Sequence, residues 1–312
     1  MGSIFAKLTQ AIRNPEMVLP YLRKLSYTYL NALRSIDVGQ ITDSTGYIII
    51  GKTYFDWRYD DQVVREIQGS KMNLQLNEML PQQLVAYGIR EPLTTKKYTE
   101  QLKSLQTDVD GKISVLEIGA NIGYYALIAA NTLENRGHIY AIEPVEENYN
   151  QLVQNVVING YQPLFTLRNY GMLDYTGEAR IKRGNKANQH TLSPTSDGDR
   201  VTVRSPSDCL DDLGLFPEQV NVIRMDIEGT ELDLLSLFEL VLTNSDQVLL
   251  QIEMHPSADK DKFKNFCSLM NLNDVELIQV VRKDRRFSPS GWRELSQSPF
   301  SDMVYFELIA RK

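Results

Sequence analysis

The sequence predicts an α/β fold built on a mostly parallel sheet with helices on both faces. Three observations lead to this prediction. From residue 113 onward, short apolar stretches alternate with longer segments of helical spacing. The stretch SVLEIGANIGYYALIAAN, residues 114–131, joins an apolar strand to an apolar helix through a glycine-containing turn. The 312 residues and the ordinary apolar fraction of 42% suit one or two globular domains.

Charge and composition narrow the class of protein. The net charge of −7 disfavours a nucleic-acid binder held by a general positive field. No apolar run is long enough for a membrane-spanning helix, and the first residues lack the pattern of a signal peptide. The two cysteines, Cys209 and Cys267, do not form the spacing of a disulfide framework or a zinc site. We therefore expect a cytoplasmic protein.

The first expected part of the chain is a basic helical segment over residues 1–44. Residues 1–36 carry a net charge of +4, so the rest of the chain carries −11. Their helical spacing is interrupted by Pro15 and Pro20. We expect either a helical cap on the main domain or peripheral contact with a membrane surface through residues 1–36.

The second expected part, residues 45–112, is an extension that packs on the core. It begins with a short apolar strand at 47–50. The segments QVVREIQ and KMNLQL alternate in polarity on either side of a turn, which predicts a β-hairpin. Helical spacing follows around 81–88 and 94–105, and the turn DVDGK ends the extension.

The third expected part, residues 113–312, is the main domain with a seven-stranded sheet. Its strands are predicted at 113–118, 138–143, 163–169, 221–226, 247–253, 275–281 and 303–311. Helices are predicted at 122–133, 146–158, 230–242 and 259–270. No helical pattern separates the last two strands, so we expect an antiparallel pair at the sheet edge. Residues 174–212 interrupt the alternation and predict a hairpin with a long polar tip, which carries His190.

The turn after the first of these strands has the chemistry of a binding site. Gly119 and Gly123 let the backbone approach a ligand and let a helix begin close to the sheet. Glu117 repels a phosphate but suits an ammonium or sulfonium group, while backbone N–H groups near Asn121 suit a carboxylate. S-adenosylmethionine has all these features. The alternative is an ordinary strand–helix–strand crossover without a ligand.

Glu143 ends the next strand, where an acid can accept hydrogen bonds from both hydroxyls of a ribose. NAD-binding proteins share this acid, but they usually carry a second glycine where this chain has Asn121. The glycine turn together with Glu117 and Glu143 therefore favours S-adenosylmethionine over a nicotinamide cofactor.

Three longer stretches resemble the FkbM-type methyltransferases. They are VLEIGANIGYYAL, YAIEPVEENYNQLVQNVVIN, and NVIRMDIEGTELDLL followed by QVLLQIEMHP. The resemblance covers residues 113–312 and reaches back to YGIREPL at 87–93, where the family often has an acid. The step Ser207-Asp208 departs from relatives that have Leu-Asp or Asp-Asp there. The resemblance implies the class I Rossmann-like fold and methyl transfer from S-adenosylmethionine, in many members to hydroxyls of sugars, lipids or natural products.

The resemblance also implies site residues. Glu117, Gly119, Asn121 and Gly123 would hold the methionine part of the cofactor and Glu143 its ribose. The remaining two, Gly171 and Met172, would lie near the adenine, although they could also form a plain turn after the third strand.

Asp226, Glu253 and His255 are the candidate catalytic residues, because they follow neighbouring strands at the edge where ligands bind. A base or a divalent metal such as magnesium could assist a sugar hydroxyl, and Asp226 and Glu253 are the metal-ligand candidates. The residue pair Glu228 and Glu231 could instead stabilise the start of the next helix.

These observations predict an O-methyltransferase acting on a hydroxyl of a saccharide, glycolipid or lipid-linked glycan. A nucleic-acid or protein methyltransferase, a nicotinamide-dependent oxidoreductase and a binding-only relative are the alternatives. The block MDIEG replaces the motif of base-amino methylation, and the acidic core disfavours nucleic acid. The sequence does not specify the acceptor or the oligomeric state.

Overall fold

The computed structural model describes residues 62–75, 79–183, 190–193, 198–282 and 285–312. All of them belong to one compact unit, Tyr59–Lys312. The basic segment 1–44 and the strand predicted at 47–50 lie outside the described residues. Within the described ranges, no helix has both the length and the apolar character needed to span a membrane.

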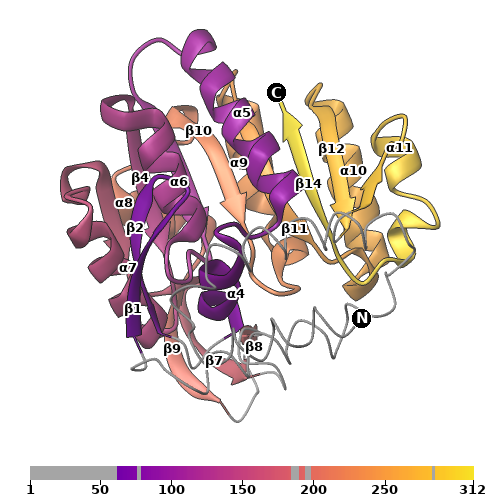
Figure 1. Cartoon of the computed structure of the whole chain (residues 1–312). Helices are drawn as coiled ribbons and strands as arrows, with labels where there is room; N and C mark the ends of the chain where they lie inside the picture. The colour runs from indigo at the N-terminus through magenta and orange to yellow at the C-terminus, as the bar shows by residue number, and fades with distance from the viewer. Residues whose placement is uncertain (1–61, 76–78, 184–189, 194–197, 283–284) are drawn as a thin grey trace, which may run out of the picture. The chain divides into compact units, whose positions relative to one another are not determined.

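An eight-stranded mixed sheet forms the centre of the unit (Figure 1). Its strands in spatial order are β13 (Arg285–Phe287), β12 (Glu276–Arg282), β14 (Phe306–Arg311), β11 (Leu249–Met254), β10 (Val220–Met225), β3 (Ile113–Ile118), β4 (Gly137–Ile142) and β5 (Phe165–Arg168). The run from β11 to β5 is parallel, whereas β14 is antiparallel to both of its neighbours. The predicted α/β fold with a mostly parallel sheet is confirmed.

Two details of the predicted sheet are wrong. The antiparallel pair β12–β14 exists, but β14 lies between β11 and β12 rather than at the edge. The sheet also has an eighth strand, because the three residues of β13 pair with the outer side of β12. A strand of three residues is too short to produce a recognisable alternation in the sequence.

Helices connect the strands and cover both faces of the sheet. The α-helices are α4 (Met79–Tyr87), α5 (Pro92–Asp108), α6 (Tyr124–Leu133), α7 (Glu146–Ile158), α8 (Pro206–Leu213), α9 (Leu235–Asn244), α10 (Lys260–Leu272) and α11 (Trp292–Leu295). Single 3₁₀ turns are η2 (Glu134–Arg136), η3 (Gln162–Leu164), η4 (Pro217–Gln219), η5 (Glu231–Leu234), η6 (Pro256–Ala258) and η7 (Phe300–Asp302). In Figure 1, α5 crosses in front of the sheet, and α5 packs on β11, β12 and β14.

The main hydrophobic core lies between the sheet and helices α8, α9 and α10. Phe238 of α9 and Phe266 of α10 are fully buried there and meet edge to face, with their ring centres 5.2 Å apart. Side chains of β10 and β11 that point to this face, such as Ile223 and Leu250, complete the core. Because every residue of these two strands is buried, both faces of the sheet are covered at its centre.

The predicted hairpin is confirmed as β1 (Gln62–Ile67) and β2 (Ser70–Gln75), which pair in antiparallel register. Its turn is formed by Gln68 and Gly69, both with positive φ (50° and 84°). The helices predicted around 81–88 and 94–105 are α4 and α5.

A second sheet of four strands contains the hairpin predicted within residues 174–212. Its order is β6 (Gly171–Met172), β9 (Asp199–Arg204), β7 (Gly177–Arg183) and β8 (His190–Ser193). The sequence did not reveal β8, which pairs with β7, or helix α8 after β9. For α8 the signal was present, since the Ser205 hydroxyl caps its N-terminus and Pro206 occupies its first turn.

Candidate active site

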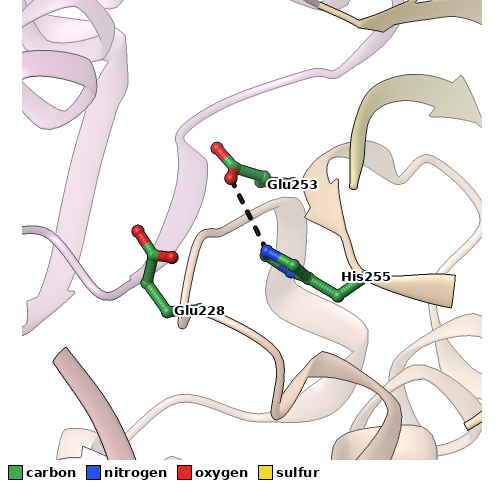
Figure 2. Close-up of side chains that lie close together, drawn as sticks. All are labelled: Glu228, Glu253 and His255. Carbon is green, nitrogen blue, oxygen red and sulfur yellow. Dashed lines mark ion pairs between the residues drawn. The ribbon is translucent and has the colours of Figure 1, made fainter. Parts of the chain in front are cut away.

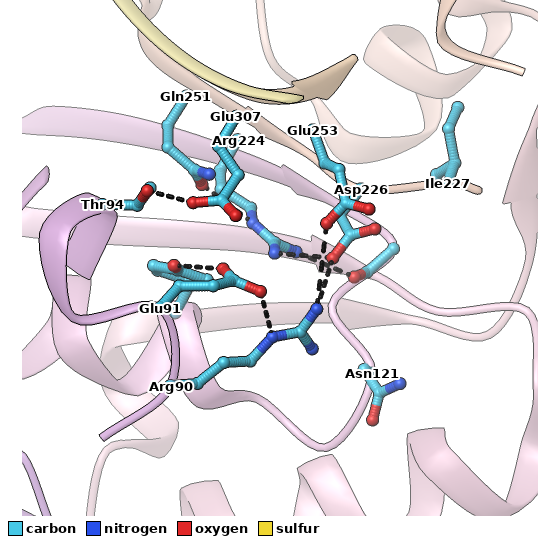
Figure 3. Close-up of polar contacts among 12 residues, drawn as sticks. Arg90, Glu91, Thr94, Asn121, Arg224, Asp226, Ile227, Gln251, Glu253 and Glu307 are labelled. Atoms are coloured by element: carbon cyan, nitrogen blue, oxygen red, sulfur yellow. Dashed lines mark hydrogen bonds and ion pairs between the residues drawn. The ribbon is translucent and has the colours of Figure 1, made fainter. Parts of the chain in front are cut away.

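The predicted site residues cluster where four parallel strands end. In the sheet β11, β10, β3 and β4 are consecutive neighbours, so their carboxyl ends share one edge. Glu117 lies near the end of β3, Glu143 follows β4, Asp226 follows β10, and Glu253 lies near the end of β11. Figure 3 shows Asp226 and Glu253 close together on this edge, with Asn121 on the neighbouring loop.

The glycine turn is held tightly against its neighbours. Gly119 has a φ of +78°, and a Cβ atom there would lie 2.2 Å from the carbonyl oxygen of Asp226. Gly123 has a φ of +92°, and its Cβ would lie 2.6 Å from Leu152 of α7. Both positions therefore require glycine, for backbone conformation and for space.

The N–H groups of residues 119–123 all donate within the protein. The first two bond the carbonyl oxygen of Ile142 at 3.1 and 3.0 Å. The third bonds Glu143 Oε2 at 2.8 Å, the fourth bonds the Asn121 side chain at 2.7 Å, and the fifth bonds the Ala120 carbonyl at 2.9 Å. A ligand carboxylate would therefore need a different donor from the one that the sequence suggested.

Glu143 is buried and holds the turn from the side of β4. Besides the bond from Asn121, its carboxylate accepts the Val145 N–H at 2.9 Å. Burial raises the pKa of Glu143 to about 7, although these hydrogen bonds oppose the rise. A carboxylate can accept about four hydrogen bonds, so Glu143 keeps capacity for the predicted ribose contact.

A row of polar side chains crosses three strands beneath the turn. Glu117, Arg224 and Gln251 are register partners on β3, β10 and β11. Arg224 donates from Nε to Gln251 at 3.0 Å and from Nη2 to Asp226 at 3.0 Å, and its Nη1 lies 3.5 Å from Glu117. Its guanidinium also lies over the Tyr125 ring, 4.4 Å from the ring centre.

Glu117 is fully buried at the end of this row. Among the described residues, neither of its carboxylate oxygens has a hydrogen-bond partner. Burial raises the pKa of Glu117 to about 7, and the nearby charge of Arg224 limits the rise. A buried acid with unused acceptor capacity is suited to a cationic ligand.

Arg90 and Glu91, which precede α5, were not predicted to act in the site, although the resemblance drew attention to the acid in YGIREPL. Arg90 Nη2 lies 3.5 Å from Asp226 Oδ2 and 3.9 Å from Glu253 Oε2, and its Nε pairs with Glu91 (Figure 3). Glu91 also accepts the Tyr125 hydroxyl at 2.7 Å. Burial favours the neutral form of Asp226, but Arg224 and Arg90 outweigh it and lower the Asp226 pKa.

His255 is oriented by a buried acid. Its Nδ1 lies 3.2 Å from both carboxylate oxygens of Glu231, which is fully buried in η5. Its Nε2 lies 3.8 Å from Glu253 Oε1 (Figure 2). Because a carboxylate only accepts, Nδ1 carries the hydrogen and the Nε2 lone pair faces the site. Glu231 therefore does more than stabilise the start of a helix.

Glu228 completes the group around His255. One ligand atom each from Glu228, Glu253 and His255 lie within 4.8 Å of one another, so this set could hold a metal ion. Of the two metal-ligand candidates, Glu253 belongs to the set, while Asp226 is engaged by Arg224 and Arg90 instead. Burial raises the pKa of Glu228 to about 7.

Three residues of the site have a strained backbone. Glu91, Asn121 and Glu228 are non-glycine residues with φ values of 45°, 51° and 55°. Each lies on a different loop at the same edge of the sheet. Such strain persists where the surrounding structure fixes it, often at functional sites.

The two residues predicted near the adenine form β6 of the second sheet. Gly171 and Met172 are buried and pair in parallel register with β9. A Cβ atom on Gly171 would lie 2.5 Å from Leu192 of β8. Their contact with an adenine stays a prediction. His190 begins β8.

Comparison with known proteins assigns the family. The family model described as the methyltransferase FkbM domain matches residues 117–286, more than half of the 312 residues. The chain belongs to the FkbM methyltransferase family. The FkbM resemblance seen in the sequence is thereby confirmed, and the chain carries an S-adenosylmethionine-dependent methyltransferase domain.

Two curated relatives of this FkbM protein are methyltransferases. The chain is 38% identical over 69 residues to a protein-L-isoaspartate O-methyltransferase of Methanosarcina mazei, covering 22% of this chain and 28% of that protein. It is 26% identical over 170 residues to the hexuronic acid methyltransferase AglP of Haloferax volcanii, covering 54% of this chain and 66% of that protein.

Solved structures similar to the FkbM chain include a methyltransferase and a protein bound to AdoMet. The FkbM methyltransferase from Methylobacillus flagellatus KT has a TM-score of 0.41 and 15% identity, over 64% of this chain and 44% of that chain. The TYW2 protein from M. jannaschii, solved in complex with AdoMet, has a TM-score of 0.44 and 11% identity, over 82% of this chain and 86% of that chain.

The donor set of this FkbM site fits S-adenosylmethionine. The unpartnered oxygens of Glu117 and the neighbouring Asp226 suit the ammonium group. The acids beyond them, Glu228 and Glu253, lie together with His255 and offer further acceptor oxygens. Among the described residues, the acids at this edge outnumber the two arginines that pair with them, so a positively charged ligand is favoured.

Proposed function

We propose that this protein is an O-methyltransferase whose acceptor is a hydroxyl of a saccharide, glycolipid or lipid-linked glycan. The observation that carries the proposal is the Glu231–His255 pair, which turns Nε2 of His255 toward Glu253. A hydroxyl needs help to lose its proton near neutral pH, and an oriented histidine supplies a base.

In this proposal S-adenosylmethionine supplies a methyl group on a sulfonium. The acceptor oxygen forms a bond to the methyl carbon while the S–CH₃ bond breaks, and S-adenosylhomocysteine leaves. The hydroxyl proton moves to Nε2 of His255, and Glu231 stabilises the resulting imidazolium. Glu253 is the weaker base candidate, because burial raises its pKa well above the usual range and keeps it protonated.

A divalent metal held by Glu228, Glu253 and His255 is the second candidate for activating the acceptor hydroxyl. The three ligand atoms are close enough, and Glu231 on Nδ1 resembles the acids that orient metal-binding histidines. His255 Nε2 cannot bind a metal and accept the proton at once. Assays of the chelator-treated protein with and without Mg²⁺ distinguish the base from the metal. If His255 acts as a base, the two activities should agree within about twofold.

The saccharide acceptor is supported by the FkbM resemblance and by the similarity to AglP, a hexuronic acid methyltransferase by name. The acid side chains of the site would also accept hydrogen bonds from sugar hydroxyls. The chain spans 66% of AglP, and the acceptor panel below tests the acceptor class directly.

The test incubates the purified protein with S-adenosylmethionine and a panel of acceptors, followed by mass spectrometry. The panel holds neutral saccharides, uronic acids, lipid-linked glycans, transfer RNA and a protein extract. We expect a product one methylene heavier only among the carbohydrates. Methylated RNA or protein without methylated carbohydrate would replace this proposal. Binding of NADH without S-adenosylhomocysteine, measured by calorimetry, would refute methyl transfer altogether.

A further inference from the structure

We propose that Arg90 binds the carboxylate of the cofactor's methionine part. The proposal rests on the proposed function, since it takes S-adenosylmethionine as the ligand. It answers a question left by the glycine turn, whose N–H groups at residues 119–123 are all used within the protein. The ligand carboxylate needs a hydrogen-bond donor, and that donor must carry a positive charge to offset repulsion by the surrounding acids.

A small cavity lies beside the glycine turn at the end of β10. Its lining consists of Leu80, Arg90, Ala120, Asn121, Tyr124, Tyr125, Arg224 and Asp226. The cavity therefore joins the predicted methionine site at Asn121 to both buried cations. An amino-acid group with one positive and one negative end matches a wall that carries both arginines and an acid.

Of the two arginines, Arg90 is the one able to meet a ligand. Arg224 is 4% exposed and uses Nε on Gln251, Nη1 on Gly119 and Nη2 on Asp226. Arg90 is 23% exposed, and its contacts to acids engage Nε and Nη2. A guanidinium has five N–H donors, so Arg90 keeps donors for a carboxylate.

The backbone of Arg90 is held in position by the helices on either side of the cavity. Its N–H donates to the Tyr124 hydroxyl of α6 at 3.0 Å, and its carbonyl accepts the Thr95 hydroxyl of α5 at 2.7 Å. Asp226 and Glu253 fix the guanidinium on the side facing the strand ends. A cation fixed in this way loses little freedom when it binds a carboxylate.

The experiment compares two ligands by titration calorimetry with the full-length protein. The first is S-adenosylhomocysteine, and the second is its decarboxylated analogue, which keeps the ammonium group and lacks the carboxylate. For Arg90→Gln we expect the affinity for S-adenosylhomocysteine to fall about 10- to 100-fold, as for the loss of a charge-assisted hydrogen bond. The affinity for the decarboxylated analogue should stay within about twofold.

Two further variants complete the design. Arg90→Lys keeps the charge but lacks the planar guanidinium. Its affinity for S-adenosylhomocysteine should lie between those of the wild type and Arg90→Gln, and its affinity for the decarboxylated analogue should not change. Arg293→Gln, at an exposed arginine of α11, should change neither affinity. Thermal unfolding of each variant checks that it folds.

The outcomes separate this proposal from the proposed function. If Arg90→Gln weakens both ligands equally, or neither, Arg90 does not bind the carboxylate and the proposal is overturned, while the methyltransferase proposal stands. If the wild type binds neither ligand, the proposed function fails and this inference fails with it.

Discussion

Arg224 is a charged side chain on a strand whose six residues are all buried. Such a charge is tolerated only where neighbouring groups compensate it, because removing it from water is costly. Glu117, Asp226 and Gln251 provide that compensation from three adjacent strands. The same arrangement fixes the acids, so the residues expected to surround the cofactor's ammonium group are already positioned in the ligand-free protein.

The Glu231–His255 pair leads to a prediction on pH dependence. Burial lowers the pKa of His255, but the hydrogen bond and charge of Glu231 outweigh it, with help from Glu228, so the pKa is raised. A base must be unprotonated, hence activity should rise with pH through this raised pKa. Glu231→Gln removes the charge that raises it, so the rise in kcat/KM should shift to lower pH.

The measurement is the pH profile of kcat/KM for wild type, Glu231→Gln and Glu239→Gln, an exposed control on α9. His255→Asn should lower kcat/KM by about 10²- to 10⁴-fold above the pKa of His255, where the base is unprotonated, and by less below it. An unchanged profile in Glu231→Gln would show that Glu231 does not set the protonation of His255.

Gly119 gives a prediction on stability. In Gly119→Ala the new Cβ would meet the Asp226 carbonyl oxygen, and the residue would keep an unfavourable positive φ. In Gly160→Ala the φ of +69° is similar, but no atom of the described residues lies within 4 Å of the Cβ. We expect Gly160→Ala to cost about 1 kcal/mol and Gly119→Ala about 2–4 kcal/mol, by urea denaturation. Equal losses would mean that the backbone at Asp226 moves away from the new Cβ at little cost.

Sequence reasoning found the acids of the site but not its arginines. Glu117, Glu143 and Glu253 lie at or just after the ends of apolar strands, and such positions can be recognised in the sequence. Arg224 meets Glu117 only through the register of β10 against β3, which the sequence does not specify. The sequence did contain a signal for Arg224, because an arginine inside the apolar run NVIRMDI implies a buried acid partner.

Helix α7 connects the N-terminal hairpin to the glycine turn. The fully buried Asn155 accepts the Asn73 N–H of β2 at 2.6 Å and donates to the Ile122 carbonyl at 2.8 Å. One side chain thus satisfies backbone groups of two elements that are distant in the sequence. The hairpin therefore contributes to the position of the turn.

Asn155→Ala should destabilise the protein by about 2–4 kcal/mol, because two buried backbone groups lose their partners. Asn159 offers a matched control one turn later on the same side. Its side chain makes a similar pair of hydrogen bonds to the Lys71 backbone. Because Asn159 is partly exposed, water can take the place of these hydrogen bonds. Asn159→Ala should cost less than about 1 kcal/mol. Chemical denaturation measures both, and similar losses would contradict the role given to burial.

At the level of elements, most of the sheet could be predicted and its spatial order could not. The seven strands and four connecting helices of the main domain are apparent from periodicity, and the structure confirms each within a few residues. The insertion of β14 between β11 and β12 depends on long-range pairing that leaves no local pattern. Glu307 on β14 thereby pairs in register with Glu253, and no local pattern in the sequence predicts that pairing.

For the whole molecule, the buried acids predict that stability falls as pH rises. Glu117, Glu143 and Glu228 have pKa values raised by burial to about 7, whereas an unfolded glutamate titrates near 4.5. The folded state therefore binds more protons between these values. The stability that each acid contributes is complete below pH 4.5 and is lost as pH rises through 7.

Urea denaturation of the ligand-free protein at pH 5.5 and pH 8 tests this expectation. The free energy of unfolding should be lower at pH 8, with each acid contributing on the order of 2 kcal/mol. Glu117→Gln cannot ionise and should reduce the difference. Stability that rises between these pH values, or a difference unchanged in Glu117→Gln, would contradict the raised pKa of Glu117.

The strained backbone at Glu91, Asn121 and Glu228 has a consequence for protein engineering. Glycine would relieve a cost on the order of 1 kcal/mol at each position. Directed evolution for heat resistance alone should therefore enrich glycine there, and these variants should lose turnover while gaining stability. Glycine at Asp274, which has a φ of 55° away from the site, should bring stability without that loss. Heat selection would then report strained positions in general, and the loss of turnover would distinguish the loops of the site from the rest.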